Sequence, residues 1–235
     1  MSALKLKKKD YLVENVFDSV IEKYDLMNDL MSLGIHRIWK QDLVNWLAPQ
    51  KNTKLIDVAS GTGDVVKIYL KKISYKGKVF CLDANKKMIN YGEKKFKTIK
   101  QINWVHSRAE KLPFKNNFFN YYTISFGIRN VSNINLCLRE AFRVLKPGGR
   151  FVCLEFSKVE NEVLEKIYKQ YSKIIPKIGK IIVGKSYPYE YLTNSIKNFY
   201  TQDELLEKIV KSKFKKVEYR NLFGGIASIH SGWKI

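Results

Sequence analysis

The stretch from Lys54 to Asp64 constrains the fold more than any other part of the chain. An apolar run that contains Asp57 breaks into the small residues Ala59-Ser60-Gly61-Thr62-Gly63, and a helical pattern resumes from Val65. This order predicts a strand, a tight turn and a helix start. Because Gly61 and Gly63 lack a Cβ atom, a ligand can approach the turn, and we expect Asp64 to cap the helix.

The residues around the turn narrow the choice of ligand. A dinucleotide-binding turn has a third glycine three residues after the second, but Val66 stands there. Asp57 and Asp64 would also place two carboxylates near a pyrophosphate, so a positively charged ligand such as S-adenosylmethionine fits better. Asp83 ends the next apolar run, where an acceptor for ribose hydroxyls is expected. A tight turn without a ligand remains the alternative, and the position of Asp83 favours the cofactor.

Length and composition indicate one compact domain. The 235 residues are 45% hydrophobic, which suits a protein with a substantial core. No run approaches the ~20 apolar residues of a membrane span, and the first residues lack the apolar region of a signal peptide. Cys81, Cys137 and Cys153 lie far apart in apolar surroundings. That spacing predicts buried thiols in a reducing cytoplasm and no metal site.

The formal net charge of +21 has three explanations. Lysine far outnumbers arginine and accompanies many isoleucines, asparagines and tyrosines, a mixture that A/T-rich codons produce, so compositional drift comes first. An anionic membrane surface comes second, since each surface lysine near such a membrane contributes ~1 kcal/mol. Nucleic acid comes third and is not expected as a partner, because the chain lacks Arg-rich runs and basic-aromatic repeats.

Alternating strand and helix patterns follow the turn. Strands are predicted at 78–83, 102–106, 118–125 and 150–156, with helices at 65–73, 86–98 and 135–145. Repeated strand-helix units indicate an α/β fold with a doubly wound, mostly parallel sheet that binds ligands at the carboxyl ends of its strands. The turn Lys146-Pro147-Gly148-Gly149 should end the last of these helices. Closing strands at 214–221 and 226–234 complete a seven-stranded sheet of six parallel strands and one antiparallel strand.

Helical segments flank this core. The apolar residues of 10–23 share one helical face and predict a cover helix, and a second helix is expected from about His36 to Trp46. Residues 159–197 predict a helical insertion after the fifth strand. Its centre mixes lysines with branched aliphatic residues, which suits a membrane interface, an apolar substrate mouth or a core helix pair with solvated lysines. Thr201 and Glu204 predict a capping box for the following helix.

We expect a single domain, 1–235, with four parts. An N-terminal helical cover spans 1–50 and a cofactor-binding core spans 51–157. The helical insertion, on the substrate side, spans 158–200. A closing helix and hairpin span 201–235.

Two long motifs and one loop resemble a known family. The first motif runs Tyr24-Asp25-Leu26-Met27-Asn28 and continues through Ser32, His36 and Trp39. The second runs Arg143-Val144-Leu145-Lys146-Pro147-Gly148-Gly149-Arg150 and continues through Glu155-Phe156-Ser157, and the loop is Ser125-Phe126-Gly127-Ile128-Arg129-Asn130. Over nearly its whole length the chain resembles the ubiquinone/menaquinone biosynthesis C-methyltransferases, which use S-adenosylmethionine on a Rossmann-like class I fold.

The resemblance implies a set of cofactor contacts. It places them at Thr62, Asp83, Arg108, Ala109 and Ser125. Ser60 stands where the family usually has glycine, and Arg108 where many members have asparagine or aspartate. Together with the residues of the turn, the predicted cofactor-binding residues are Asp57, Ser60, Gly61, Thr62, Gly63, Asp83, Arg108, Ala109 and Ser125.

The resemblance also implies a polyprenylated quinol substrate, either a 2-polyprenyl-6-methoxy-1,4-benzoquinol or a demethylmenaquinol. Its ring carbon would attack the sulfonium methyl group. Arg129 could stabilise the developing phenolate while Asn130 holds it in place. His36, His230 and Tyr24 are candidates for proton handling, and each also fits a packing role. Alignment of donor and acceptor can supply much of the rate without a strong base.

Two other functions remain open at this point. An RNA or protein methyltransferase on the same fold fits the charge, but it would want a motif such as Asn-Pro-Pro-Tyr where this chain has Phe126 to Asn130. A non-catalytic cofactor-binding scaffold in a quinone-biosynthesis assembly is the other, and the intact glycine turn and its acidic residues argue against it. We expect a cytoplasmic enzyme, peripheral at the inner face of the membrane, and a homodimer or quinone-biosynthesis assembly as its partners.

Overall fold

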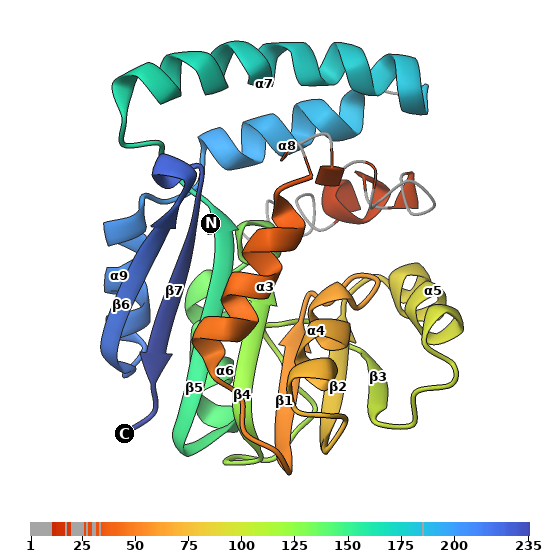
Figure 1. Ribbon diagram of the computed structural model, residues 1–235, viewed down its shortest axis with the longest axis vertical. Helices are drawn as coiled ribbons and strands as arrows, with labels where there is room; N and C mark the ends of the chain where they lie inside the picture. The colour runs from red at the N-terminus through yellow and green to blue at the C-terminus, as the bar shows by residue number, and fades with distance from the viewer. Residues whose placement is uncertain are drawn as a thin grey trace.

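A twisted sheet forms the centre of the computed structural model, which describes residues 11–16, 18–19, 26, 28–29, 32, 34–184 and 186–235 (Figure 1). In these residues its strand order is β3-β2-β1-β4-β5-β7-β6. Only β7 runs antiparallel to its neighbours. The predicted α/β fold with a seven-stranded, mostly parallel sheet is therefore confirmed. The strands are β1 (Thr53–Val58), β2 (Gly77–Asp83), β3 (Ile102–His106), β4 (Phe119–Ser125), β5 (Leu145–Phe156), β6 (Lys215–Leu222) and β7 (Ala227–Trp233).

Helices connect and cover the strands, and the insertion after β5 is helical as predicted. The capping box that opens α9 is present, with both the Thr201 and the Glu204 hydrogen bonds formed. Residues 11–16 are helical, in agreement with the predicted cover helix, and much of the remainder of that segment lies outside the described residues. The helices are α3 (His36–Leu47), α4 (Asp64–Lys72), α5 (Lys86–Lys95), η2 (Ile128–Asn130), α6 (Ile134–Val144), α7 (Glu162–Val183), α8 (Tyr187–Lys197), α9 (Gln202–Lys211) and η3 (Phe223–Gly225).

Both faces of the sheet are buried, which explains why its strands are apolar runs rather than alternating patterns. Successive side chains of a strand point to opposite faces. Leu55 of β1 and Val152 of β5 pack with α3 and α4 on one face. Ile56 and Cys153, the next residue in each strand, pack with α6 and α9 on the other. The three cysteines are buried free thiols, as predicted.

Two boundaries differ from the sequence prediction by more than one residue. Helix α5 ends at Lys95 rather than at residue 98. Strand β5 begins at Leu145, although we expected it to begin at Arg150. Leu145 pairs with Phe119 and Arg150 with Tyr121, so the intervening Lys146–Gly149 segment forms a bulge in which Gly148 has a φ of +76°. Helix α6 ends just before this segment, where the prediction placed its end.

The order of the strands positions a site at one end of the sheet. Strand β1 lies between β2 and β4, and the chain reverses the direction of sheet growth there, which is where ligands bind in folds of this class. Figure 1 shows α8, and beyond it α7, past the upper end of the sheet, where the parallel strands finish. Within the described part of the chain, no helix has the length and apolar character needed to span a membrane.

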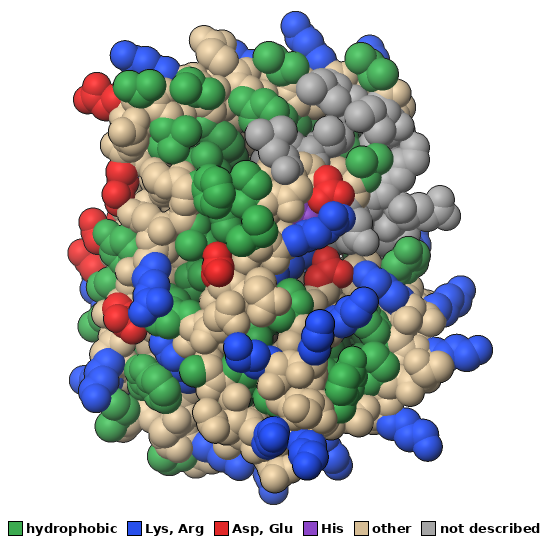
Figure 2. All heavy atoms as spheres, viewed as in Figure 1, with side chains coloured by type: hydrophobic (Ala, Val, Ile, Leu, Met, Phe, Trp, Pro, Cys, Tyr) green, Lys and Arg blue, Asp and Glu red, His purple; other side chains and the backbone are tan. Residues whose placement is uncertain are grey.

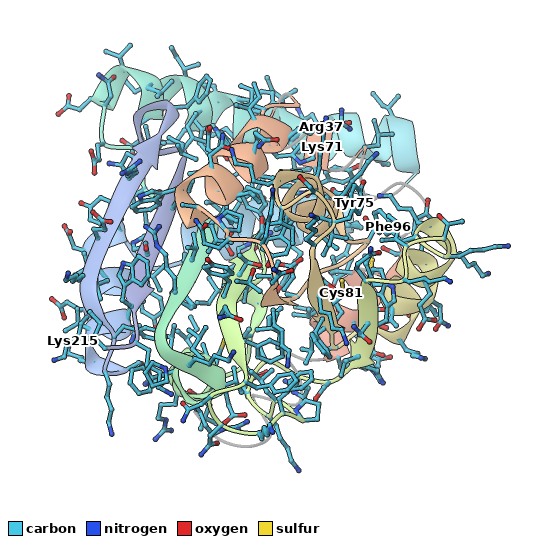
Figure 3. All side chains as sticks on the ribbon, turned by 60° about the horizontal axis from the view of Figure 1, so that its bottom comes forward. Arg37, Lys71, Tyr75, Cys81, Phe96 and Lys215 are labelled. Carbon is cyan, nitrogen blue, oxygen red and sulfur yellow. The ribbon has the colours of Figure 1, made fainter. Side chains whose placement is uncertain are left out.

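A close helix-strand contact at Gly92 gives the first testable prediction. A Cβ atom at this position of α5 would overlap the ring of Trp104 on β3, which stacks on Phe96 with ring centroids 6.4 Å apart. Phe96, which follows α5, is labelled in Figure 3. We therefore expect Gly92→Val to lower the free energy of unfolding by about 3 kcal/mol, as overpacking of a core does. Thermal unfolding measures the loss. Adding Trp104→Leu should restore part of it, and an unchanged Tm for the single variant would contradict the prediction.

Candidate functional site

Asp83 joins the glycine turn to the end of β2. One carboxylate oxygen, Oδ2, accepts the backbone N–H of Gly61 at 2.9 Å, and the other, Oδ1, accepts the backbone N–H of Asn85 at 2.8 Å. Burial raises the pKa of this carboxyl, and the two N–H donors counter that effect. Carboxylate oxygens accept more than one hydrogen bond each, so Asp83 retains acceptor capacity toward a ligand.

A cavity of about 420 Å³ opens beside Asp83 at the switch point of the sheet. Its volume lies within the range of small-molecule sites, roughly 300–1,000 Å³. Five of the predicted site residues line it, namely Gly61, Asp83, Arg108, Ala109 and Asn130. They lie at or just after the ends of β1, β2, β3 and β4, and the parallel arrangement of these strands brings them to one edge of the sheet.

The N-terminal helical residues border the same cavity. Val13 and Glu14 line it. Farther along, Asp18 accepts a hydrogen bond from Asn85 Nδ2 at 2.7 Å and pairs with Lys87 Nζ at 2.6 Å. Described residues of this segment therefore border the cavity, and Asp18 attaches the segment to the start of α5.

A second, more polar cavity of about 20 Å³ lies on the other side of the turn, large enough for about one water molecule. The remaining predicted cofactor residues except Gly63 line it, namely Asp57, Ser60, Thr62 and Ser125. Asp57 accepts a hydrogen bond from Thr123 Oγ1 at 2.6 Å. Burial raises the pKa of Asp57 to about 7, although the Thr123 bond and Lys40 oppose the shift. The Ser125 hydroxyl is buried without a hydrogen-bond partner among the described residues. A buried polar atom of this kind points to a ligand.

Asp64 does not cap α4, contrary to our expectation. Gly63 is the N-cap residue, with a left-handed φ of +87°, and Asp64 is the first residue of the helix. Its carboxylate instead pairs with Lys40 Nζ at 2.8 Å and Lys95 Nζ at 3.1 Å. Burial alone would raise the pKa of Asp64, but the two lysines hold it well below its usual range. The sequence prediction failed because these lysines come from distant helices.

Gly63 lines neither cavity. A Cβ atom there would lie 3.0 Å from the rings of Phe96 and Trp104. Close packing and the left-handed φ therefore account for glycine at this position. A contact between Gly63 and the cofactor stays a prediction.

Arg129 forms a buried ion pair at the end of β4. Its Nη1 atom donates to Glu155 Oε1 at 2.5 Å and to the carbonyl oxygen of Phe126 at 2.7 Å. The side chains of Arg129 and Glu155 are 3% and 1% exposed. Burial raises the pKa of Glu155, and Arg129 counters that shift. The pair fixes the loop that follows β4.

A groove of about 820 Å³ separates this loop from α8. Arg129 and Tyr191 line it. Asn130, by contrast, lines the 420 Å³ cavity, and its Oδ1 atom accepts the Tyr191 hydroxyl at 3.0 Å. Arg129 and Asn130 therefore line two neighbouring cavities.

The two histidines that were candidates for proton handling, His36 and His230, lie apart from this pair. His36 Nε2 lies 2.9 Å from Asp29 Oδ1, and burial lowers the pKa of His36. His230 Nε2 lies 2.9 Å from the Gln202 carbonyl oxygen, and burial lowers its pKa to about 4. Neither residue lines the cavities described above. Tyr24 lies outside the described residues, and its proposed role stays a prediction.

Sequence reasoning missed Lys40, and it did not identify Glu155, which belongs to the second motif, as the partner of Arg129. Both carried a signal. Lys40 falls on the buried face of α3, beside Trp39 and Leu43, where a cation needs a partner. Glu155 is the one carboxylate within the buried part of β5, Arg150 to Phe156. A charged residue in such a run indicates a buried ion pair.

Comparison with known proteins identifies the family of the chain. The model of the ubiE/COQ5 methyltransferase family matches residues 4–234. A ubiquinone/menaquinone biosynthesis C-methyltransferase UbiE of Rickettsia prowazekii is 49% identical over 97% of this chain and 94% of its own length. A relative of the same name from Bartonella bacilliformis is 49% identical over 97% and 90%.

A solved structure has the same fold. The S-adenosylmethionine-dependent methyltransferase of Aquifex aeolicus superposes with a TM-score of 0.68, at 18% identity, over 92% of this chain and 98% of its own. The chain is therefore an S-adenosylmethionine-dependent methyltransferase by family, and it has the fold of such an enzyme. It belongs to the ubiE/COQ5 methyltransferase family.

Proposed function

We propose that the enzyme methylates a ring carbon of a polyprenylated benzoquinol or naphthoquinol in ubiquinone or menaquinone biosynthesis. One observation carries the proposal: relatives named for that activity match 97% of the chain at 49% identity. The arrangement of the two larger cavities supports it, because a donor cavity and an acceptor groove meet at Arg129 and Asn130.

We assign S-adenosylmethionine to the 420 Å³ cavity, with its amino acid end directed toward the small polar cavity on the other side of the glycine turn. When bound, the cofactor supplies the electrophilic methyl group. Asp83 would accept the ribose hydroxyls, with Arg108 and Ala109 on the adenine side of the 420 Å³ cavity. Asp57 and Ser125, which line the polar cavity, would hold the ammonium group at that end. A buried carboxylate and a buried unpaired hydroxyl suit an ammonium group, which needs acceptors.

We assign the acceptor ring to the Arg129 side of the loop. Loss of a hydroxyl proton raises electron density on the ring carbon, and negative charge develops on the oxygen. The guanidinium of Arg129 is already held by Glu155 and Phe126, so it can stabilise that charge without reorganising. Asn130, fixed by Tyr191, would position the ring against the donor cavity.

The raised pKa of Asp57 predicts pH-dependent cofactor binding. The ionised carboxylate binds an ammonium group better than the neutral acid does, and a pKa of about 7 means that the ionised fraction falls below pH 7. We therefore expect affinity for S-adenosylhomocysteine to fall by about tenfold between pH 8 and pH 6. Calorimetric titration measures it. Asp57→Asn should bind weakly with a flat profile over this range, and a flat profile in the wild type would contradict the assignment.

A methyl-transfer assay tests the proposed function. The purified enzyme is incubated with methyl-labelled S-adenosylmethionine and a short-chain, water-soluble demethylmenaquinol or methoxybenzoquinol. We expect label on the quinol ring. Transfer to RNA or to protein, with none to either quinol, would overturn the proposal. Cofactor binding without transfer to any of them would instead favour a scaffold.

We also propose that the enzyme acts at an anionic membrane surface, since a polyprenyl tail remains in lipid. The net charge of +21 is compatible with such a surface. Assembly as a homodimer or with other proteins of quinone biosynthesis stays a prediction.

A further inference from the structure

Helix α7 lies farthest from the sheet, on the side of the candidate site. Figure 1 shows it beyond α8, past the end where the parallel strands finish. Helix α8 in turn contacts the loop after β4 and holds Asn130 through Tyr191. A surface bound along α7 would therefore lie close to the acceptor groove, which α8 borders.

Four large apolar side chains are exposed along one line of α7. Val163, Ile167, Ile174 and Ile181 are 67%, 61%, 50% and 84% exposed. Their spacings of four and seven residues place them on the same narrow face of a helix. A different side of α7, about 100° around the helix from Ile174, packs on the protein through residues such as Ile175, which is 1% exposed. Four exposed apolar side chains in one row differ from single exposed residues and indicate an interaction surface.

Lysines border this row on one flank. They are Lys166, Lys169, Lys173, Lys177 and Lys180, all exposed. Figure 2 shows apolar and basic side chains intermixed along the upper edge of the molecule, where α7 lies. An apolar row beside a row of lysines is the pattern of a helix that lies in the interface of an anionic membrane, with the apolar side chains in the acyl region and the ammonium groups among the headgroups.

We propose that the exposed face of α7 docks the enzyme on an anionic lipid bilayer, with the helix lying parallel to the membrane plane. The inference rests on the proposed function, which supplies a substrate anchored in lipid, and it names the surface that meets that lipid. Docked in this way, α7 brings α8 and the acceptor groove to the membrane, so the quinol head can enter while its tail stays in the bilayer.

A second copy of the chain is a less suitable partner for the exposed face of α7 than a membrane is. Pairing two α7 helices would bring two lysine-rich helices together, and like charges disfavour that contact. A bilayer rich in phosphatidylglycerol supplies both an apolar interior and negative charge, which matches both rows of α7.

Vesicle flotation tests the proposal. The full chain is mixed at low salt with vesicles of phosphatidylcholine containing phosphatidylglycerol, or of phosphatidylcholine alone. We expect flotation with the anionic vesicles, its loss in the variant Ile167→Gln with Ile181→Gln, and roughly tenfold weaker binding in Lys173→Gln with Lys177→Gln. The control is Val210→Gln, which changes a residue on α9 that is 49% exposed and should float like the wild type.

Two outcomes would overturn the proposal. One is flotation of the double isoleucine variant at the wild-type level, and the other is failure of the wild type to float. Light scattering without vesicles can give a third contradicting outcome. If the wild type is a dimer and the double isoleucine variant is a monomer, the exposed face of α7 is a dimer interface. Circular dichroism checks that all variants remain folded.

The water-soluble quinol assay separates this proposal from the proposed function. The double isoleucine variant should methylate a short-chain quinol at the wild-type rate, because its substitutions lie on the surface of α7. Loss of quinol methylation in the wild type with flotation intact would overturn the function alone. Intact methylation without flotation would overturn the docking surface alone.

Discussion

Replacing Arg129 with alanine should lower the free energy of unfolding by about 3–5 kcal/mol, because it leaves Glu155 buried without its cation. The side chain of Glu155 is 1% exposed, and its Oε1 atom lies 2.5 Å from Arg129 Nη1. Two backbone N–H groups, from Phe156 and from residue 129 itself, would remain as donors at 2.9 and 3.3 Å. They cannot replace a full charge. Denaturant unfolding of the variant measures the loss.

Loss of methyl transfer in Arg129→Ala would therefore not establish a catalytic role. A variant that replaces both partners, Arg129→Met with Glu155→Met, removes the ion pair without leaving a lone charge, and such replacements are often neutral for stability. If Arg129 contacts the acceptor, the double variant should unfold near the wild type and bind S-adenosylhomocysteine normally. Its turnover on a short-chain quinol should fall by about 10²–10³, the cost of one lost oxyanion donor.

Glu155→Gln supplies the matched control for this pair. It keeps Arg129 and removes only the negative charge, so turnover should fall far less than in the double methionine variant. A stable double methionine variant whose turnover stays within about tenfold of the wild type would contradict the assignment of Arg129 to the acceptor. An unchanged free energy of unfolding in Arg129→Ala would contradict the buried pair.

Local sequence pattern was sufficient for the sheet and most of its helices, because apolar runs and turn residues act within a few positions. Ile102 to His106 and the capping box at Thr201 came out as predicted. Errors arose where a distant contact decides. Strand pairing between Phe119 and Leu145 extends β5 past its proline and glycines, and no local pattern reports that partner.

The site shows the same division. Asp83 was predicted from its position at the end of a strand, and it does line the 420 Å³ cavity. The partners of Asp64 and Arg129 were missed, since Lys40 is 24 residues away and Glu155 is 26. Ion pairs between distant segments depend on the tertiary fold. Sequence can indicate that a buried charge needs a partner, but the topology determines which residue supplies it.

Asp83→Ala should weaken S-adenosylhomocysteine binding by at least about 100-fold, because two ligand hydroxyls would lose a charged acceptor, and each such bond is worth about 1.5–3 kcal/mol. The substitution also removes the acceptor of the Gly61 and Asn85 N–H groups, so the turn loses its tie to β2. Both effects act on the cofactor rather than on the acceptor. Turnover at saturating cofactor should therefore change much less than affinity.

Calorimetric titration measures this affinity, and the ligand-induced rise in Tm provides a second readout, since a ligand stabilises the folded state according to its concentration and Kd. Asp203→Asn, which removes an exposed carboxylate on α9, is the control for loss of one negative charge. It should bind like the wild type. Unchanged affinity of Asp83→Ala for S-adenosylhomocysteine would show that the nucleoside end of the cofactor does not bind at the end of β2. A fall in turnover at saturating cofactor as large as the fall in affinity would instead place Asp83 in the chemistry of methyl transfer.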